Sequence, residues 1–187
     1  MTVGLLGREE TPPPIALAAA ERLCGSCGMC CDGVLFHSVE LQSGDQPRQL
    51  ASRGVKIRKK KGVQFFLQPC SAHREDACQC SCTIYEERPI RCRRFDCRQL
   101  RGVVAGEITE ESACEKIMQA RNQVAQVNAL IAQLGETNPN RSLAHRVANA
   151  LTLPKDVERN PLHDQLDFTM KKLEAFLQQE FRLPMGF

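Results

Sequence analysis

The sequence predicts an α+β protein, in which a small cysteine-rich, metal-stabilised module is followed by an α-helical C-terminal part. Eleven of the 187 residues are Cys, and nine of these fall in two clusters between residues 24 and 97. Short apolar runs separated by turn residues continue to about residue 101, which is typical of small strands and helices. After Gly106 apolar residues recur at helical spacing. We expect a flexible N-terminal tail over residues 1–20, a cysteine-cluster metal-binding module over 21–101 and a helical region over 102–187.

Within the first half, the elements are expected to be short. The prolines before residue 15 allow at most a short helix over 15–22. Apolar runs bounded by Gly, Pro or basic residues predict a strand over 34–36, a helix over 45–53, and a hairpin of strands 55–58 and 63–67. The hairpin turn, Lys59-Lys60-Lys61-Gly62, is basic. Pro89 is suited to start a helix that places Cys92 one turn along.

The second half predicts three helices. Ser112 and Glu115 resemble a capping box, and apolar residues at helical spacing follow as far as Gly135. A shorter helix is expected over 141–151, and Pro154 begins a brief segment. Asn160-Pro161 predicts the start of a last helix, which runs through Phe181. Such apolar stripes indicate core packing, and the helices could also pack against a protein partner or a second copy of the chain.

Cysteine chemistry depends on the compartment. The first 31 residues lack the basic start and unbroken apolar run of a signal peptide, and no stretch approaches ~18 uninterrupted apolar residues. We therefore expect a cytoplasmic protein with no membrane span. Thiols stay reduced there, so clustered cysteines indicate metal ligands or redox centres before structural disulfides.

The first cluster is Cys24-x-x-Cys27-x-x-Cys30-Cys31. A C-x2-C-x2-C run matches the spacing with which bacterial ferredoxins hold three corners of a [4Fe–4S] cluster, whereas zinc sites more often use separate C-x2-C pairs. Adjacent side chains point in different directions, so Cys30 and Cys31 can both bind metal only if the site is large, polynuclear or double.

The second cluster leaves its ligand set open. Cys78, Cys80 and Cys82 would share one face of an extended segment, so all three could bind a thiophilic ion, but Cys82 alone is favoured because such close sulfurs seldom all reach one metal. His73 stands three residues after Cys70, a spacing that can chelate zinc, although a loop histidine is more often solvent-facing. Cys114, near Ile117, is expected to be a small core residue.

Several separated motifs together resemble the CxxCxxCC family of zinc- or iron-chelating, YkgJ-like cysteine-cluster proteins. They are Cys24 to Cys31, Pro69-Cys70, and the run from Cys82 through Tyr85, Arg88-Pro89 and Cys92 to Phe95. The resemblance covers about residues 24 to 98. It implies a cytosolic metal- or iron–sulfur-binding module, and flagellin lysine methylases contain a similar region. It also implies the ligands Cys24, Cys27, Cys30, Cys31, Cys70, Cys82 and Cys92, with Cys97 as an eighth.

Arginines accompany the second motif. Metal–thiolate centres carry net negative charge, which cations and N–H donors around the sulfurs offset. Arg88 and Arg91 are the expected second-layer groups, and Phe95 and Tyr85 are expected to shield the site from water. The alternative is that these arginines only solvate a surface.

The sequence thus predicts a metal-binding protein that holds a [4Fe–4S] cluster or Zn²⁺ for a structural or electron-transfer role, with the ferredoxin-like spacing favouring iron–sulfur. A metal-dependent enzyme of redox or methyl-transfer chemistry is an alternative, although no nucleotide-binding or hydrolytic motif is present and no catalytic residue is assigned. Thiol–disulfide exchange lacks a surrounding thioredoxin-like pattern.

A nucleic-acid-binding module is a further alternative. Residues 48–101 hold 14 Lys and Arg against 5 Asp and Glu, and Phe65, Phe66 and Tyr85 could stack on bases. No known nucleic-acid-binding signature is present. Thiolates of bound metal sites would offset part of this positive charge, which weakens the nucleic-acid hypothesis.

Overall fold

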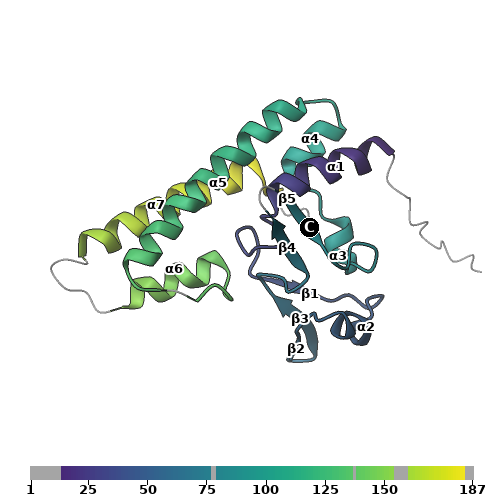
Figure 1. Cartoon of the computed structure of the whole chain (residues 1–187), viewed down its shortest axis with the longest axis horizontal. Coiled ribbons are helices and arrows are strands. Elements are labelled where there is room, and N and C mark those ends of the chain that lie inside the picture. The colour runs from purple at the N-terminus through teal and green to yellow at the C-terminus, as the bar shows by residue number, and fades with distance from the viewer. Residues whose placement is uncertain (1–13, 77–78, 137, 154–159, 184–187) are drawn as a thin grey trace, which may run out of the picture.

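The chain folds as an α+β protein, as predicted, in a computed structural model that describes residues 14–76, 79–136, 138–153 and 160–183 (Figure 1). Its elements follow one another along the chain as α1 (Pro14–Cys27), β1 (Ser38–Glu40), α2 (Pro47–Ser52), β2 (Ile57–Lys60), β3 (Val63–Leu67), β4 (His73–Asp76), β5 (Gln79–Cys82), α3 (Ile90–Arg94), α4 (Arg98–Val104), α5 (Glu110–Gln133), α6 (Leu143–Thr152) and α7 (Asn160–Glu180).

Five helices, α1, α4, α5, α6 and α7, form what we call the helical body. Helix α5 packs along α7, while α1 and α4, which precede it in the chain, pack against α5 (Figure 1). Leu173, Leu177 and Phe181 of the last helix and turn are fully buried against Val127 and Ile131 of α5. The predicted apolar stripes therefore do form the core.

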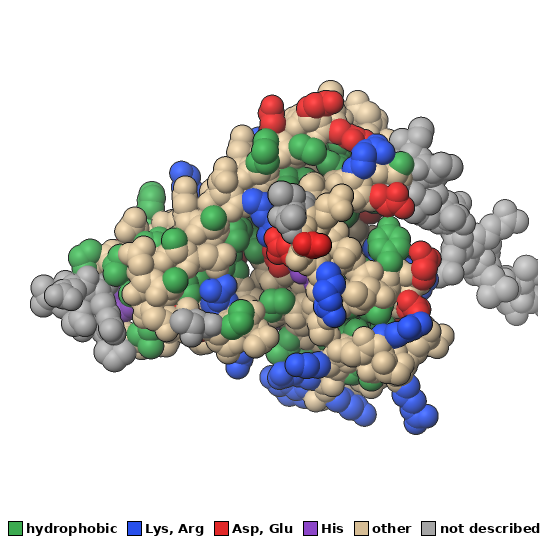
Figure 2. All heavy atoms as spheres, viewed as in Figure 1, with side chains coloured by type: hydrophobic (Ala, Val, Ile, Leu, Met, Phe, Trp, Pro, Cys, Tyr) green, Lys and Arg blue, Asp and Glu red, His purple; other side chains and the backbone are tan. Residues whose placement is uncertain are grey.

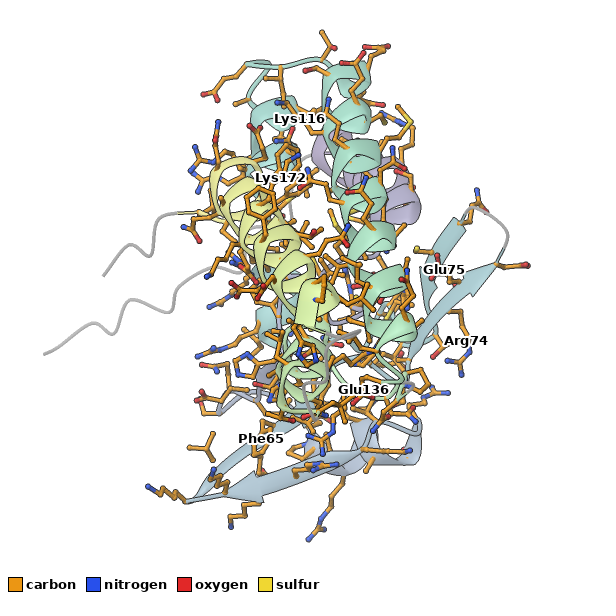
Figure 3. The ribbon with its side chains drawn as sticks, turned by 90° about the vertical axis from the view of Figure 1, so that its left-hand side faces the viewer. Phe65, Arg74, Glu75, Lys116, Glu136 and Lys172 are labelled. Atoms are coloured by element: carbon orange, nitrogen blue, oxygen red, sulfur yellow. The ribbon has the colours of Figure 1, made fainter. Side chains whose placement is uncertain are left out.

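Residues 38–94 form what we call the sheet module. Its three-stranded antiparallel sheet has the order β1-β3-β2, with Phe66 opposite both Val39 and Ile57. Phe66, Leu50, Val55 and Ile84 pack into a second core that is separate from the helical one. Strands β4 and β5 form their own antiparallel hairpin beside the helices, away from the sheet that carries Phe65 (Figure 3).

Local signals explain several boundaries. The β2–β3 hairpin is confirmed, although β2 spans Ile57–Lys60 instead of 55–58, so Lys59 and Lys60 lie in the strand and not in the turn. The two-residue turn places Lys61 at φ +49° and Gly62 at φ +84°, the left-handed pair that tight hairpins favour. Helix α5 begins earlier than the Ser112–Glu115 box predicts, so that prediction is wrong. Thr109 is the N-cap, and its side chain accepts a hydrogen bond from the Ser112 N–H at 3.2 Å.

The strand predicted over 34–36 is also wrong, because the first strand begins at Ser38. The Val34 N–H is bound by the Asp32 carboxylate at 2.9 Å and the Leu35 N–H by the Met29 carbonyl at 3.0 Å. These backbone groups are satisfied within a turn, and both apolar side chains are buried in the helical core.

The helix expected over 15–22 is longer than predicted and continues through Cys27. The first thirteen residues of the expected tail and the segment expected at Pro154 lie outside the described residues. Among the helices described, none combines the length and hydropathy needed to cross a membrane.

Candidate metal centre

The eight cysteines proposed as ligands come from six short stretches of chain. They lie in α1 (Cys24, Cys27), in the turn after it (Cys30, Cys31), between β3 and β4 (Cys70), at the end of β5 (Cys82), in α3 (Cys92) and at the N-cap of α4 (Cys97). All ten cysteines that the structure describes are free thiols. No disulfide therefore occupies any of the described cysteines.

Four of these cysteines, Cys24, Cys27, Cys30 and Cys97, gather beside the helical core, and we call them the helix-side group. Cys27 is buried in that core, and Cys30 and Cys97 pack against it. Helix α1, which carries Cys24 and Cys27, packs against α4, whose N-cap is Cys97. A thiolate on Cys97 would raise the pKa of Cys24, Cys27 and Cys30 alike, so all four sulfurs share one neighbourhood.

The other four, Cys31, Cys70, Cys82 and Cys92, gather beside the sheet core, and we call them the sheet-side group. Cys70, Cys82 and Cys92 pack against that core. The Cys70 N–H donates to the Cys31 carbonyl at 2.8 Å, which joins Cys31 to this group. The negative charges of Cys70, Cys92 and Cys82 would each raise the pKa of Cys31.

Burial dominates the electrostatics of both groups. It raises the pKa of Cys24 to about 11 and those of Cys27 and Cys92 to about 12, and it raises the pKa of Cys30 and Cys31 as well. Cys24 lies at the surface as a residue, yet neighbouring atoms desolvate its sulfur. Without a cation these thiols stay protonated at neutral pH, so a thiolate cluster here needs a metal to stabilise it.

Of the two arginines predicted to support the centre, Arg88 acts on both groups. Its positive charge lowers the pKa of Cys24 and of Cys92, which belong to different groups. Its guanidinium lies 3.6 Å over the ring of Tyr85, and its Nε donates to the Tyr85 carbonyl at 2.9 Å, which fixes its position. Arg91 instead pairs with Glu40 at 3.7 Å.

Helix α3 and its approach are held by specific contacts. The Ile90 N–H donates to the Asp45 carboxylate at 2.7 Å, so the first turn of α3 is tied to the start of the α2 region. Phe95, which follows α3, meets Phe36 edge to face with ring centroids 4.8 Å apart. These contacts fix the segment that connects Cys92 to Cys97.

Two residues left open by the sequence, His73 and Cys80, meet at Gly28. A Cβ on Gly28, whose φ is +65°, would stand 2.6 Å from Cys80 Sγ and 3.0 Å from His73 Nε2. His73 Nε2 is buried with no hydrogen-bond partner in the described part of the chain, so His73 is not the solvent-facing loop residue expected. Cys78 lies outside the described residues.

Arg121 and Asp32 are polar neighbours of the cysteines that sequence reasoning missed. Arg121 Nη1 donates to Asp32 at 2.6 Å, and its Nη2 lies 3.8 Å from Cys80 Sγ. The charge of Arg121 also lowers the pKa of Cys27. Asp32 could have been suspected because it follows Cys31 directly, whereas no local pattern links Arg121 of α5 to Asp32, which lies 89 positions earlier.

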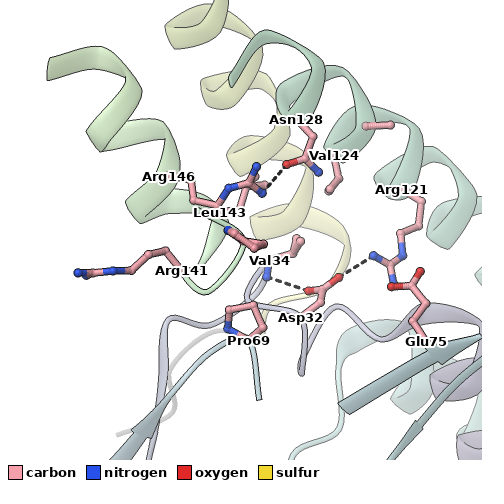
Figure 4. Close-up of a pocket in the computed structure, with 12 residues that line it drawn as sticks. Asp32, Val34, Pro69, Glu75, Arg121, Val124, Asn128, Arg141, Leu143 and Arg146 are labelled. Carbon is pink, nitrogen blue, oxygen red and sulfur yellow. Dashed lines mark hydrogen bonds and ion pairs between the residues drawn. The ribbon is translucent and has the colours of Figure 1, made fainter. Parts of the chain in front are cut away.

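A cavity of about 340 Å³ opens on the far side of the Asp32–Arg121 pair, between α5, α6 and the turn at Val34 (Figure 4). Arg146 donates to Asn128 at 2.7 Å on its wall. None of the described cysteines lines this cavity, so it is separate from both thiol groups.

The two groups are neighbouring thiols rather than finished coordination spheres. Within the described ranges, no three Cys, His, Asp or Glu side chains already have the arrangement of a metal site. Metal binding would therefore require these side chains to rearrange, for instance by changes of χ1 between staggered positions. Four soft, free thiols fit Zn²⁺ or an iron–sulfur cluster by donor chemistry.

Comparison with known proteins adds no relative. No protein-family model, no curated protein and no solved structure matches this chain. The resemblance to the CxxCxxCC proteins therefore stays a prediction from the motifs.

Proposed function

We propose that this protein binds metal through its clustered cysteine thiolates, as zinc or as iron–sulfur centres, and that the metal stabilises the small sheet module. One observation carries the proposal. Eight cysteines from six separate stretches between residues 24 and 97 form two neighbourhoods, one beside each apolar core, and all are free thiols. In a reducing compartment such as the cytoplasm, metal binding is the usual use of such a gathering.

A structural role is favoured by the small size of the sheet core. Among the described residues, seven buried hydrophobic residues make up that core, compared with twenty-two in the helical core. Five strands and two helices cannot be stabilised well by so little apolar burial. Small domains of this kind commonly depend on a structural metal.

The proposal is tested by anaerobic purification followed by metal analysis, labile-sulfide analysis and absorption spectroscopy. Stoichiometric zinc in a colourless protein would assign zinc, and iron with labile sulfide would assign an iron–sulfur centre. The same samples are then treated with a thiol-alkylating reagent. A metal-free folded protein in which all cysteines alkylate without chelator would contradict the proposal.

The basic hairpin supports nucleic-acid binding as a second candidate function. Arg58, Lys59, Lys60 and Lys61 are all exposed, and none belongs to an ion pair among the described residues (Figure 2). Phe65 lies directly across from Arg58 in the hairpin register, so an aromatic ring accompanies the cations. This combination is typical of single-strand binding surfaces.

This second candidate is tested with a fluorescent single-stranded RNA at several salt concentrations. Changing Lys59, Lys60 and Lys61 to Ala should weaken binding and reduce its salt dependence by roughly one to three ions. Changing Lys171 and Lys172 of α7 to Ala is the matched control and should have no effect. Absence of binding at low salt, or equal binding by all variants, would exclude this function.

A further inference from the structure

We infer that the cysteines form two separate four-thiolate centres, one from the helix-side group and one from the sheet-side group. The first would use Cys24, Cys27, Cys30 and Cys97, and the second Cys31, Cys70, Cys82 and Cys92. This inference rests on the proposed metal binding and adds the number of centres and the ligands of each. A single polynuclear site built from all eight thiolates is the competing arrangement.

The adjacent residues Cys30 and Cys31 lie on different sides of one turn. Both residues lie in the turn that follows α1, where the Cys31 N–H donates to the Gly28 carbonyl at 2.8 Å. The Cys30 side chain packs against the helical core, whereas the Cys31 carbonyl accepts a hydrogen bond from the N–H of Cys70, which packs against the sheet core. One turn thus supplies one sulfur to each side.

The remaining cysteines divide between the two apolar cores. Cys27, Cys30 and Cys97 contact the helical core, and Cys70, Cys82 and Cys92 contact the sheet core. No described cysteine packs against both cores. A single centre would need all these sulfurs to leave their cores and converge, whereas two centres let each sulfur stay on its own side.

The pattern of charge interaction agrees with this division. The thiolates that most affect Cys31 are Cys70, Cys92 and Cys82, and those that most affect Cys92 are Cys70 and Cys82. The pKa of Cys24 is raised by the Cys97 thiolate and by no sheet-side thiolate. Among the thiolates, Cys27 raises the pKa of Cys30 most, and Cys31 also raises it because the two residues are adjacent in the sequence.

The chemistry of each group is consistent with a complete centre. The helix-side group combines three closely spaced cysteines with one remote cysteine, the ligand pattern of a [4Fe–4S] cluster, and in two-cluster ferredoxins the last cysteine of such a run serves the other cluster. Four thiolates around a divalent ion leave a net charge of about −2. Arg88, whose charge acts on both Cys24 and Cys92, offsets part of that charge for both centres.

The test compares metal content in variants that each remove one ligand. Cys27→Ala removes a helix-side ligand and Cys82→Ala a sheet-side ligand. Cys80→Ala, two residues from Cys82 on the same strand, and Cys114→Ala, in α5, are matched controls outside both groups. Each protein is reconstituted anaerobically with zinc alone, and separately with iron and sulfide, and the bound metal per chain is measured.

We expect Cys27→Ala and Cys82→Ala each to keep half of the wild-type metal, a variant that combines both substitutions to keep none, and both controls to keep all of it. Loss of all metal in either single variant would overturn the two-centre arrangement while leaving metal binding intact. Absence of metal from the wild-type protein would instead contradict the proposed function itself.

A measurement on the wild-type chain covers the case in which a variant does not fold. The metal-loaded protein is treated with graded chelator, alkylated briefly and weighed as an intact chain. Two centres predict an intermediate with four newly alkylated cysteines, and peptide mapping should find these four in one group. Release of all eight cysteines in a single step, with no such intermediate, would overturn the inference.

Discussion

The helical body and the sheet module differ in what stabilises them. The body buries long helices against one another, and Leu166, Leu173, Leu177 and Phe181 of its last helix and turn are completely inaccessible to solvent. The sheet module has short strands of three to five residues and a core centred on Phe66. Three cysteines of the sheet-side group, Cys70, Cys82 and Cys92, pack against that small core. Thiols therefore make up a larger share of the surroundings of the small core than of the large one.

Removal of metal should separate the two regions most strongly. Structural zinc in small domains contributes roughly 10 kcal/mol or more of folding free energy, so a chelator should unfold the sheet module. The helical body should keep its helical circular dichroism, because proposed metal ligands lie only at its α1–α4 end. The rest of its core contains none. Limited proteolysis is expected to cut residues 38–94 and to spare α5 and α7.

Cleavage that begins in α5 or α7, or an unchanged digestion pattern in protein shown to be metal-free, would contradict this comparison. Loss of Cys92 by Cys92→Ala should produce the same digestion of the sheet module without chelator.

Metal affinity should rise with pH, most clearly at the helix-side group. Burial raises the pKa of Cys24, Cys27, Cys30 and Cys97, so these thiols are protonated at neutral pH before metal binds. Four ligands then release about four protons, and the affinity should increase by about 5 kcal/mol per pH unit. Competition with a chelator of known affinity at pH 6.5, 7.0 and 7.5 measures this. A pH-independent affinity would show that these thiols are not the ligands.

Core truncations should distinguish the regions by their dependence on metal. Leu173→Ala in the helical body should lower the free energy of unfolding by about 2–5 kcal/mol with or without metal, because α7 packs on α5 in both states. Phe66→Ala in the sheet module should cost about 3–5 kcal/mol only in the metal-loaded protein, since the module is expected to be unfolded without metal. Denaturant unfolding of each variant, with and without metal, measures the four changes in the free energy of unfolding. If Phe66→Ala destabilised the metal-free protein as much as the metal-loaded protein, the sheet core would fold without metal.

Gly28→Ala should disturb the junction between the two regions. Its left-handed φ of +65° disfavours a side chain by roughly 1–2 kcal/mol, and the new Cβ would also collide with Cys80 Sγ at 2.6 Å. Gly106→Ala is the matched control, because Gly106 has φ +72° and open space around it. We expect a larger drop in melting temperature for Gly28→Ala, together with reduced metal content. Equal effects of the two substitutions would mean that the contact at Gly28 has no consequence.

Much of the fold follows from local pattern. Helical periodicity located α5, α6 and α7, and Gly62 marked the tight hairpin turn. The strand expected at Val34 failed because apolar residues in a short run suit a buried turn as well as a strand. Only tertiary contacts decide between these two outcomes.

The candidate site was predictable in part for the same reason. The Cys24–Cys31 run is visible in the sequence, but the assignment of Cys30 and Cys31 to different sides depends on the contact of Cys31 with Cys70. Arg121 reaches Asp32 and Cys80 from a helix far along the chain. Contacts between residues so distant in sequence leave no periodic signal.

Native mass spectrometry of the anaerobically purified chain tests the central claim most directly. The account predicts a folded chain heavier than its polypeptide by two zinc ions or two iron–sulfur clusters, which are released when the protein is denatured. A folded chain with the mass of the polypeptide alone would contradict the claim that metal holds the sheet module.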